Sequence, residues 1–370
     1  LTEALLLAQH CQQRNGLCRM NKPLKRNSFI AAFLALFLGS VLFFTGGDDI
    51  QQLNGLTMGT SYQVQIVDMP ANIAAADLAA DIGELLKQLD TETFSTYASN
   101  SELSRFNRHG VNTPFAASSQ MIEVLLMAQE ISALSGGAFD VTVGPLVNLW
   151  GFGPNLAVFE TVPTQSQIDD ARLRVGFEFL RISPANKEIR KTRDMYVDLS
   201  AIAKGYAVDQ LAEYLDEIGV DNYFLEIGGE LKIKGSKPGG EGWVPAIEAP
   251  VETVSEVYQI FYSRGDNIAV AGSGDYRNYF EEEGQRYSHE IDPRNGRPVT
   301  HSLAAAYVID ESTARADALA TTYMILGPDA AEDLASRQGQ AVYFIYKSGG
   351  DGFEDYVSAE FNRYLESDLQ

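Results

Sequence analysis

The chain has 370 residues, 45% of them hydrophobic, and a formal net charge of −22. A chain of this size can bury the core of one large domain or two moderate ones. Because basic residues form no runs in the body, nucleic-acid binding through a basic face is disfavoured, and an anionic ligand would need a local cation or a metal ion.

Residues 20–47 have the pattern of an export signal. Lys22, Lys25 and Arg26 precede an apolar run at 29–44, and small and acidic residues follow it. The run is about 16 residues long, slightly short for a spanning helix. The basic flank predicts that the body, residues 48–370, faces outward. An uncleaved N-terminal anchor is the alternative, and residues 1–19 have no assigned role because Met20 is a more natural start.

The body lacks the motifs of several common enzyme classes. Both cysteines, Cys11 and Cys18, precede Met20, so the body has no disulfide, thiol nucleophile or cysteine metal site. Its histidines are not paired at zinc-ligand spacing. The sequence also lacks a Walker phosphate loop, a Gly-x-Ser-x-Gly elbow and a dinucleotide-binding Gly-x-Gly-x-x-Gly.

The first half of the body is predicted to contain both helices and short strands. Alternation of apolar and polar residues indicates strands, and apolar periodicity with capping residues indicates helices. The expected elements are a strand at 60–67, a helix at 74–89, a polar turn-rich segment at 94–107, a helix at 118–134, a short strand at 138–143 ended by Gly144 and Pro145, a loop at 154–163 and a helix at 165–175.

The second half is predicted to be rich in hairpin-linked strands. Because strands outnumber helices, we expect an α+β fold with a mainly antiparallel or mixed sheet and packed helices, in a single two-lobed body. The expected elements are strands at 196–199, 223–227, 231–234, 243–249, 257–262, 268–271, 277–281, 286–289, 303–309 and, last, 341–346, with helices at 206–218 and 314–322.

The helix expected at 314–322 carries a candidate metal site. Asp317 and Thr321 are four residues apart, so their side chains leave the same helical face. A carboxylate and a hydroxyl together are hard oxygen ligands of the kind that Mg²⁺ prefers. The alternative is a capped, packed alanine helix without a ligand.

Residues 200–205 form a candidate anion site. Small residues lead to Lys204 and Gly205, which open a helix, so helix-start amides and an ammonium group face the same point. A backbone carbonyl such as that of Ala201 could face a metal. Alternatively, Lys204 is a solvated surface lysine.

Two further segments could carry chemistry. His289 is expected at the end of a strand before a sharp turn, where it could accept a proton from a hydroxyl group; a hydrogen-bonded structural histidine is the alternative. Segment 136–144 could place Phe139 against a flat ring and Asp140 on its polar edge, or it could be a turn followed by a core strand. Residues 228–230 indicate a tight turn between strands.

Together these motifs resemble the FAD:protein FMN transferase family, also called ApbE. Each motif alone is weak, and the resemblance depends on their order across the body from about residue 57 to 328. The matching segments are 58–60, 95–97 with 101–103, 137–145, 197–206, 228–229, 271–277, 289–297 and 316–321.

The resemblance implies an exported enzyme on the periplasmic face of the inner membrane. Such an enzyme splits FAD, transfers FMN through a phosphoester bond to a threonine or serine hydroxyl of an acceptor protein, and releases AMP. Family acceptors include flavin subunits of sodium-translocating NADH:quinone reductase and of Rnf-type complexes. The implied residues are His289 as base, Ala201 (carbonyl), Asp317 and Thr321 for Mg²⁺, and Met58, Tyr97, Ala138, Phe139, Asp140, Asp198, Lys204, Ile291 and Ala320 for FAD.

The chain departs from the family pattern in two places. Glu290 occupies a position where a β-branched apolar residue is usual, and no lipoprotein cysteine follows the leader. Two alternatives remain, a FAD pyrophosphatase that gives FMN and AMP, and an exported flavin-binding protein without chemistry. Each reading that binds a dinucleotide at a metal requires Asp317 and Lys204 to face one shared cleft.

Overall fold

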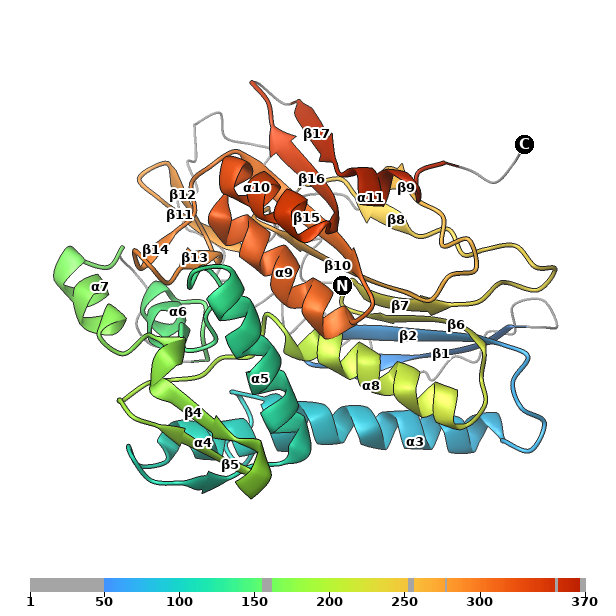
Figure 1. The fold of residues 1–370 in the computed structure, drawn as a ribbon, viewed down its shortest axis with the longest axis horizontal. Helices are drawn as coiled ribbons and strands as arrows, with labels where there is room; N and C mark the ends of the chain where they lie inside the picture. Colours follow the sequence, from blue (N-terminus) through green and yellow to red (C-terminus); the bar gives the residue numbers. More distant parts are fainter. Residues whose placement is uncertain (1–49, 155–161, 252–255, 277, 350–351, 367–370) are drawn as a thin grey trace, which may run out of the picture. The chain divides into compact units, whose positions relative to one another are not determined.

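An eight-stranded antiparallel sheet is the largest element of the fold (Figure 1). The computed structural model describes residues 50–154, 162–251, 256–276, 278–349 and 352–366. The expectations for residues 1–19 and 20–47, and most of the loop expected at 154–163, lie outside these ranges. In sheet order the strands are β1 (Ile50–Thr57), β2 (Thr60–Val67), β6 (Asn222–Ile227), β7 (Glu230–Lys234), β10 (Ile268–Gly274), β15 (Leu303–Asp310), β16 (Ala341–Lys347) and β17 (Phe353–Val357).

Alternate residues of the inner strands contribute to cores on opposite faces of the sheet. In β16, Val342 and Phe344 join the large core under the helices, whereas Tyr343 and Ile345 join a second core that includes Trp243. This follows from the two-residue period of a strand. Since β16 is covered on both faces, its sequence is almost continuously apolar.

The long helices cover one face of the sheet. α8 packs on β6 and β7, α9 packs on β10 and β15, and the two helices pack against each other (Figure 1). Among the described residues, no helix is long and apolar enough to cross a membrane. The helices are α3 (Ala75–Lys87), which continues as a π-helical segment (Gln88–Phe94), α4 (Glu102–Arg108), α5 (Ser119–Leu134), α6 (Gly144–Trp150), α7 (Gln165–Arg172), α8 (Ala203–Glu217), α9 (Thr313–Leu326), α10 (Pro328–Gln338) and α11 (Ala359–Asn362).

The contact between α8 and α9 is tight because Gly205 has no side chain. A Cβ atom at Gly205 would lie 2.4 Å from the carbonyl oxygen of Thr313 and 2.7 Å from Cα of Ala314. Asp209, one turn later on α8, accepts hydrogen bonds from the backbone N–H groups of Thr313 (2.7 Å) and Ala314 (2.9 Å). It also accepts a hydrogen bond from the Ser312 hydroxyl (2.7 Å). α8 therefore supplies acceptors for the unpaired donors at the start of α9.

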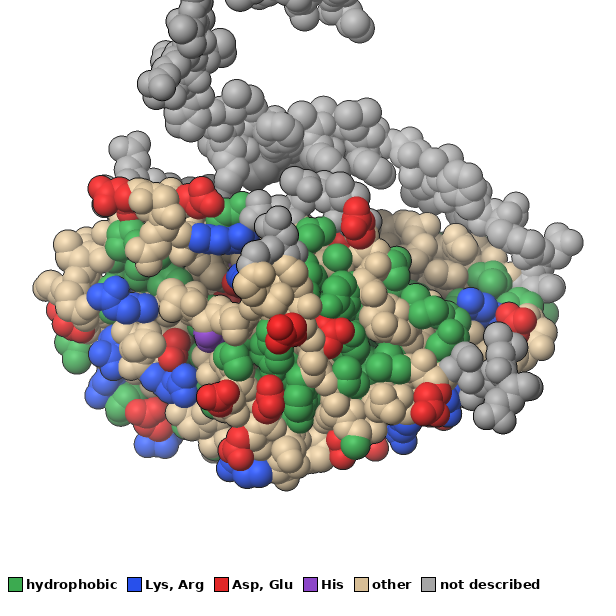
Figure 2. Space-filling view, turned by 90° about the horizontal axis from the view of Figure 1, so that it is seen from above, with side chains coloured by type: hydrophobic (Ala, Val, Ile, Leu, Met, Phe, Trp, Pro, Cys, Tyr) green, Lys and Arg blue, Asp and Glu red, His purple; other side chains and the backbone are tan. Residues whose placement is uncertain are grey.

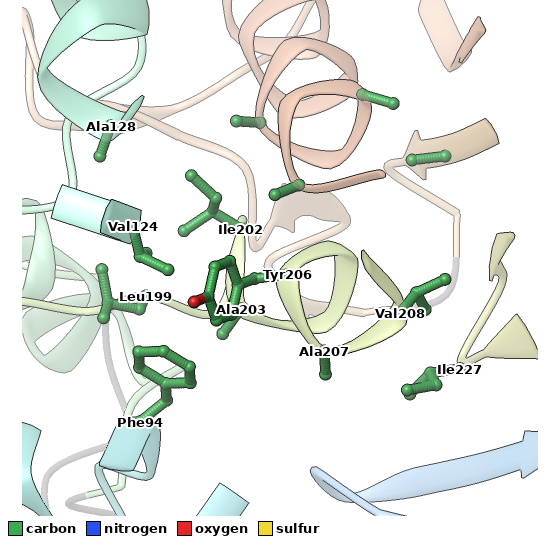
Figure 3. Close-up of a cluster of buried hydrophobic side chains, with 14 of the residues drawn as sticks. Phe94, Val124, Ala128, Leu199, Ile202, Ala203, Tyr206, Ala207, Val208 and Ile227 are labelled. Atoms are coloured by element: carbon green, nitrogen blue, oxygen red, sulfur yellow. The ribbon is translucent and has the colours of Figure 1, made fainter. Parts of the chain in front are cut away.

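A buried apolar cluster fixes the loop that leads into α8 (Figure 3). Leu199 and Ile202 of this loop are at most 1% exposed. The ring of Tyr206 meets that of Phe94 edge to face, with centroids 5.6 Å apart. The backbone next to Lys204 is thus held by core packing on both sides of that residue.

Smaller sheets surround the main one. Two of them matter for the site, because β12 leads directly to His289 and β13 begins at Ile291. The smaller sheets consist of β3 (Phe115–Ala116) with β5 (Glu188–Lys191) and β4 (Leu180–Ser183), β8 (Ala246–Glu248) with β9 (Val257–Ile260), β11 (Tyr279–Glu282) with β12 (Gln285–Ser288), and β13 (Ile291–Asp292) with β14 (Arg297–Pro298).

The α+β class and the mainly antiparallel sheet are confirmed, and the residues described form one compact unit. The helices expected at 118–134, 165–175, 206–218 and 314–322 are all present, and the strand expected at 60–67 has those bounds. The helix at 314–322 begins after Ser312, whose side chain accepts the N–H of Arg315 as an N-cap.

Several local predictions are wrong. Segments 138–143 and 196–199 form no extended strands and share only one parallel bridge, between Val143 and Tyr196. Gly144 and Pro145 begin helix α6, because proline is well tolerated in a first helical turn. The turn-rich segment 94–107 includes most of α4, which Ser101 caps. Strand β17 follows the segment expected to be the last strand.

Candidate active site

A cleft of about 730 Å³ brings together most of the residues singled out from the sequence. Its walls come from α8, α9, the β6–β7 turn, the end of β10 and the segment after β12. Of the predicted site residues, those that line it are Tyr97, Ala138, Phe139, Asp140, Asp198, Ala201, Lys204, His289, Ile291, Asp317 and Thr321.

Lys204 lies between two buried carboxylates in this cleft. Its Nζ is 3.1 Å from Oε1 of Glu230 and 3.6 Å from Oδ2 of Asp317. The same Asp317 oxygen accepts the backbone N–H of Gly205 at 3.1 Å. Glu230 and Asp317 are only 3% and 4% exposed. The shared cleft that the sequence interpretation required for Asp317 and Lys204 is therefore present.

Burial perturbs all three charged groups. Burial raises the pKa of Glu230 to about 8, although Lys204 opposes this change. Burial also raises the pKa of Asp317, again against the effect of Lys204. Burial alone would lower the pKa of Lys204, but Asp317 and Glu230 together raise it above its ordinary value. The two carboxylates therefore favour the protonated form of Lys204, and burial favours the neutral form of each carboxyl group.

The expected metal ligands face the same cleft. Asp317, Thr321 and Ala201 are among its lining residues. The neighbouring Thr322 hydroxyl donates to the carbonyl of Ala318 (2.7 Å). In the part of the chain that the structure describes, Thr321 has no such bond, and Oδ1 of Asp317 accepts none.

These groups fit the coordination chemistry of Mg²⁺. In the described ranges, no three His, Cys, Asp or Glu side chains are placed to bind a metal together. Magnesium commonly uses one or two carboxylates, with water and substrate phosphates filling the other positions. A donor set of one carboxylate, one hydroxyl and one carbonyl is therefore suitable for Mg²⁺ shared with a phosphorylated ligand, rather than for a metal enclosed by protein.

His289 lines the cleft just after β12. Its Nδ1 is 3.0 Å from the carbonyl oxygen of Asn278, and its Nε2 is 3.7 Å from Oε1 of Glu290. The side chain is 33% exposed. Its ring also meets Phe152 edge to face, with centroids 6.2 Å apart. The histidine is thus held in place by hydrogen bonding and is also accessible to a ligand. Both features that the sequence analysis treated as alternatives, a structural hydrogen bond and access to a hydroxyl group, therefore occur together.

Asp140 and Asp198 use their carboxylates mainly to shape the backbone. Asp140 accepts the N–H and the hydroxyl of Thr142, both at 2.7 Å, and the N–H of Phe177 at 2.9 Å. These bonds fold the segment after Phe139 into a turn, which is why the strand expected there does not form. Asp198 accepts the N–H of Ser200 at 2.9 Å. Both residues border the cleft and support its walls.

Met58 and Ala320 do not line the cleft. Met58 occupies the β1–β2 turn with a positive φ of 48°, and its N–H donates to Oδ2 of Asp90 at 2.9 Å. Ala320 is fully buried in α9. Position 320 lies 100° around the helix from position 321, and its methyl group packs in the main hydrophobic core.

Sequence reasoning missed three polar residues of the cleft: Glu230, Ser273 and Glu290. Residues 228–230 were interpreted only as a turn, which the β6–β7 hairpin confirms. Two signals were available in the sequence. Glu230 directly follows two glycines, and Glu290 precedes the apolar Ile291. A carboxylate buried at such a position needs a polar partner. Tyr97, in contrast, is 72% exposed and borders the cleft as a large accessible ring.

The outer surface agrees with the charge argument. On the face drawn in Figure 2, several basic side chains lie toward the left edge with acidic ones among them, and apolar side chains gather toward the middle. Fold and cleft together define an α+β protein with a buried lysine–carboxylate cluster in a cleft beside the main sheet.

Comparison with known proteins identifies the family. The pattern of the ApbE family matches residues 58–344. The FAD:protein FMN transferase of Vibrio cholerae is 43% identical over 313 residues, covering 85% of this chain and 92% of that protein. The protein of the same name from Escherichia coli K12 is 36% identical over 345 residues, with coverages of 90% and 97%. The crystal structure of Pseudomonas stutzeri flavinyl transferase ApbE, in its apo form, has a TM-score of 0.78 and 39% identity, with coverages of 88% and 100%. The chain belongs to the ApbE family.

Proposed function

We propose that the protein transfers FMN from FAD to a threonine or serine hydroxyl of an acceptor protein and releases AMP. Relatives named FAD:protein FMN transferase align with most of this chain, and the alignment also covers most of their own length. The observation that best supports the reaction is the placement of Lys204, Asp317 and His289 on one cleft. The cleft offers a cation for the pyrophosphate and a base for the hydroxyl.

The reaction needs an in-line attack on phosphorus. The acceptor oxygen forms a bond to the phosphorus of the FMN half, and its proton passes to a base. The bond from that phosphorus to the bridging oxygen breaks, and the electron pair leaves with AMP. Lys204 would neutralise charge on the pyrophosphate, while the amides at the start of α8 would orient it.

Asp317, Thr321 and the carbonyl of Ala201 would bind Mg²⁺ when FAD is present. A magnesium ion bound there would neutralise phosphate charge as a Lewis acid. The residues themselves position the phosphates by placing hard oxygen donors on one wall. The N–H of Gly205 and the ammonium of Lys204 fix the Asp317 carboxylate, and so determine which of its oxygens faces the cleft.

His289 would act as the base. The carbonyl of Asn278 only accepts hydrogen bonds, so the Nδ1 atom facing it carries the proton. In the neutral ring Nε2 then has a free lone pair. A positioned base of this kind contributes about 10²–10⁴-fold to the rate.

We further propose that the body works outside the cytoplasm, on the periplasmic face of the inner membrane. The support is the basic, apolar and acidic order of residues 20–47. The acceptors would be flavin subunits of sodium-translocating NADH:quinone reductase or of Rnf-type complexes. Mass spectrometry of the mature N-terminus tests the leader, and flavin-labelled bands lost on gene deletion test the acceptors.

The activity is tested by incubating the protein with FAD and Mg²⁺, with and without an acceptor peptide. We expect AMP release together with a mass gain of FMN on a peptide hydroxyl. AMP without the mass gain would indicate a FAD pyrophosphatase instead. Absence of AMP in both incubations, with FAD still bound, would indicate a flavin-binding protein and contradict the proposal.

A further inference from the structure

Glu290 joins His289 to the main sheet through a buried polar contact. Its Oε1 accepts the hydroxyl of Ser273, on β10, at 2.6 Å. The same oxygen lies 3.7 Å from Nε2 of His289. Glu290 is only 4% exposed, so the position of this carboxylate is determined by these neighbours rather than by water. Ser273 and His289 both border the cleft.

The ring orientation of His289 is fixed from its other side. The carbonyl of Asn278 is 3.0 Å from Nδ1 of His289 and 3.0 Å from its backbone N–H. Because a carbonyl oxygen accepts two hydrogen bonds and donates none, Nδ1 must be the protonated nitrogen of the neutral ring. Nε2, with its lone pair, is therefore the ring nitrogen closest to Glu290.

We propose that Glu290, held by Ser273, is a positioning residue that stabilises the positive charge His289 acquires when it accepts the acceptor's proton. This inference rests on the proposed function, in which His289 is the base. Before proton transfer, Nε2 and the carboxylate have no proton between them, and their 3.7 Å separation exceeds a hydrogen bond. After transfer, the imidazolium has an opposite charge beside it.

The neighbouring charges determine how strongly Glu290 depends on a positive charge at His289. Burial raises the pKa of Glu290, while His289 and the Ser273 hydroxyl oppose this effect, and Asp275 and Asp317 add to it. Asp275 is itself paired with Lys347 from β16. An imidazolium at His289 therefore places a positive charge 3.7 Å from a carboxylate that is otherwise costly to ionise. Proton transfer to the ring and ionisation of Glu290 favour each other.

The test is a double-mutant cycle that measures AMP release from FAD at saturating Mg²⁺ and acceptor. We expect Glu290→Gln to lower kcat about tenfold or more, with KM for FAD changed less than about twofold, because the loss is confined to the transition state. In the His289→Ala background, Glu290→Gln should have no further effect. Ser273→Ala should give a smaller loss that likewise disappears without the histidine.

A matched control removes a carboxylate elsewhere. Glu123 accepts the Tyr206 hydroxyl at 2.7 Å and does not border the cleft, so Glu123→Gln should retain the parent kcat. Equal slowing by Glu290→Gln in both backgrounds would assign Glu290 a purely structural role. Unchanged kcat in the single variant would also overturn the inference.

A second readout does not depend on turnover. Nitrogen NMR of ¹⁵N-histidine-labelled protein at alkaline pH should show His289 as the neutral tautomer protonated at Nδ1, and Glu290→Gln should shift its Nε2 resonance. A ring protonated at Nε2 would overturn the inference. A parent protein that releases no AMP would refute the proposed function, and the ring signals would still decide whether Glu290 faces the lone pair.

Discussion

Substituting Gly205 by alanine tests whether the tight contact between α8 and α9 builds the site. The added Cβ would lie 2.4 Å from the Thr313 carbonyl oxygen, and the atoms it meets belong to the backbone. An ordinary carbon–oxygen contact is about 3.3 Å, so the helices must separate by roughly 0.9 Å. Overpacking of this kind costs about 1–3 kcal/mol. For a body of this size we expect the melting temperature to fall by about 2–4 °C.

The same displacement should reduce turnover more than stability. The N–H of Gly205 donates to Asp317, and the adjacent Lys204 contacts the same carboxylate, so separation of the helices moves an anion-binding group and a metal ligand apart. A misplacement near 1 Å costs about 100-fold in rate. AMP release from FAD under saturating conditions, together with thermal unfolding, measures both effects.

Gly83→Ala is the matched control. Gly83 lies in helix α3, and a Cβ atom there would meet nothing within 4 Å. Alanine should stabilise that helix by about 0.5–1 kcal/mol and leave the rate unchanged. If Gly205→Ala keeps the parent melting temperature and rate, the close approach of the two helices does not determine the geometry of the site.

Four further predictions concern single side chains. Asp317→Ala should remove nearly all turnover and the response of the remaining rate to Mg²⁺; transfer at the parent rate would exclude Asp317 as a metal ligand. His289→Ala should slow turnover by about 10²–10⁴-fold at unchanged FAD affinity, measured by titration, whereas a large loss of FAD binding would make it a ligand contact. Asp209→Ala should lower the free energy of unfolding by about 1–3 kcal/mol in denaturant titrations, because three donors at the start of α9 lose their acceptor; an unchanged midpoint would contradict that capping role. The folded-state pKa of Glu230 is about 8, above its ordinary value of 4.5, so the folded state binds the extra proton and stability falls as pH rises between these values. With a metal chelator present, Glu230→Gln should therefore flatten the melting temperature against pH in this window, and parallel curves would show that Glu230 does not titrate there.

The parts of the fold that the sequence predicted are those with a local cause. The helix at 314–322 follows from Ser312, an alanine-rich run and Gly327, and each of these signals acts within a few residues. The sheet strands follow from alternation in the same way. Lys204 and Asp317 could be paired beforehand only through the resemblance to a family, because 112 positions separate the Asp317 carboxylate from the Gly205 amide that binds it.

What could not be predicted depends on contacts between distant segments. The strand expected at 138–143 was based on β-branched composition, but the Asp140 carboxylate binds the N–H groups of Thr142 and Phe177 and forms a turn. Glu290 departs from the apolar family pattern, and its partner is Ser273 of β10, whose hydroxyl donates to its carboxylate. Side-chain hydrogen bonds that compete with secondary structure have no periodic signature in a sequence.

The Lys204 cluster takes its three charges from α8, β7 and α9, which are separated in the chain and meet only when the tertiary structure is complete. The unfolded chain therefore presents these groups singly to solvent and has no binding site for a dinucleotide. Under the proposed function, FAD binds only the folded protein, so it raises the free energy of unfolding by RT ln(1 + [FAD]/Kd).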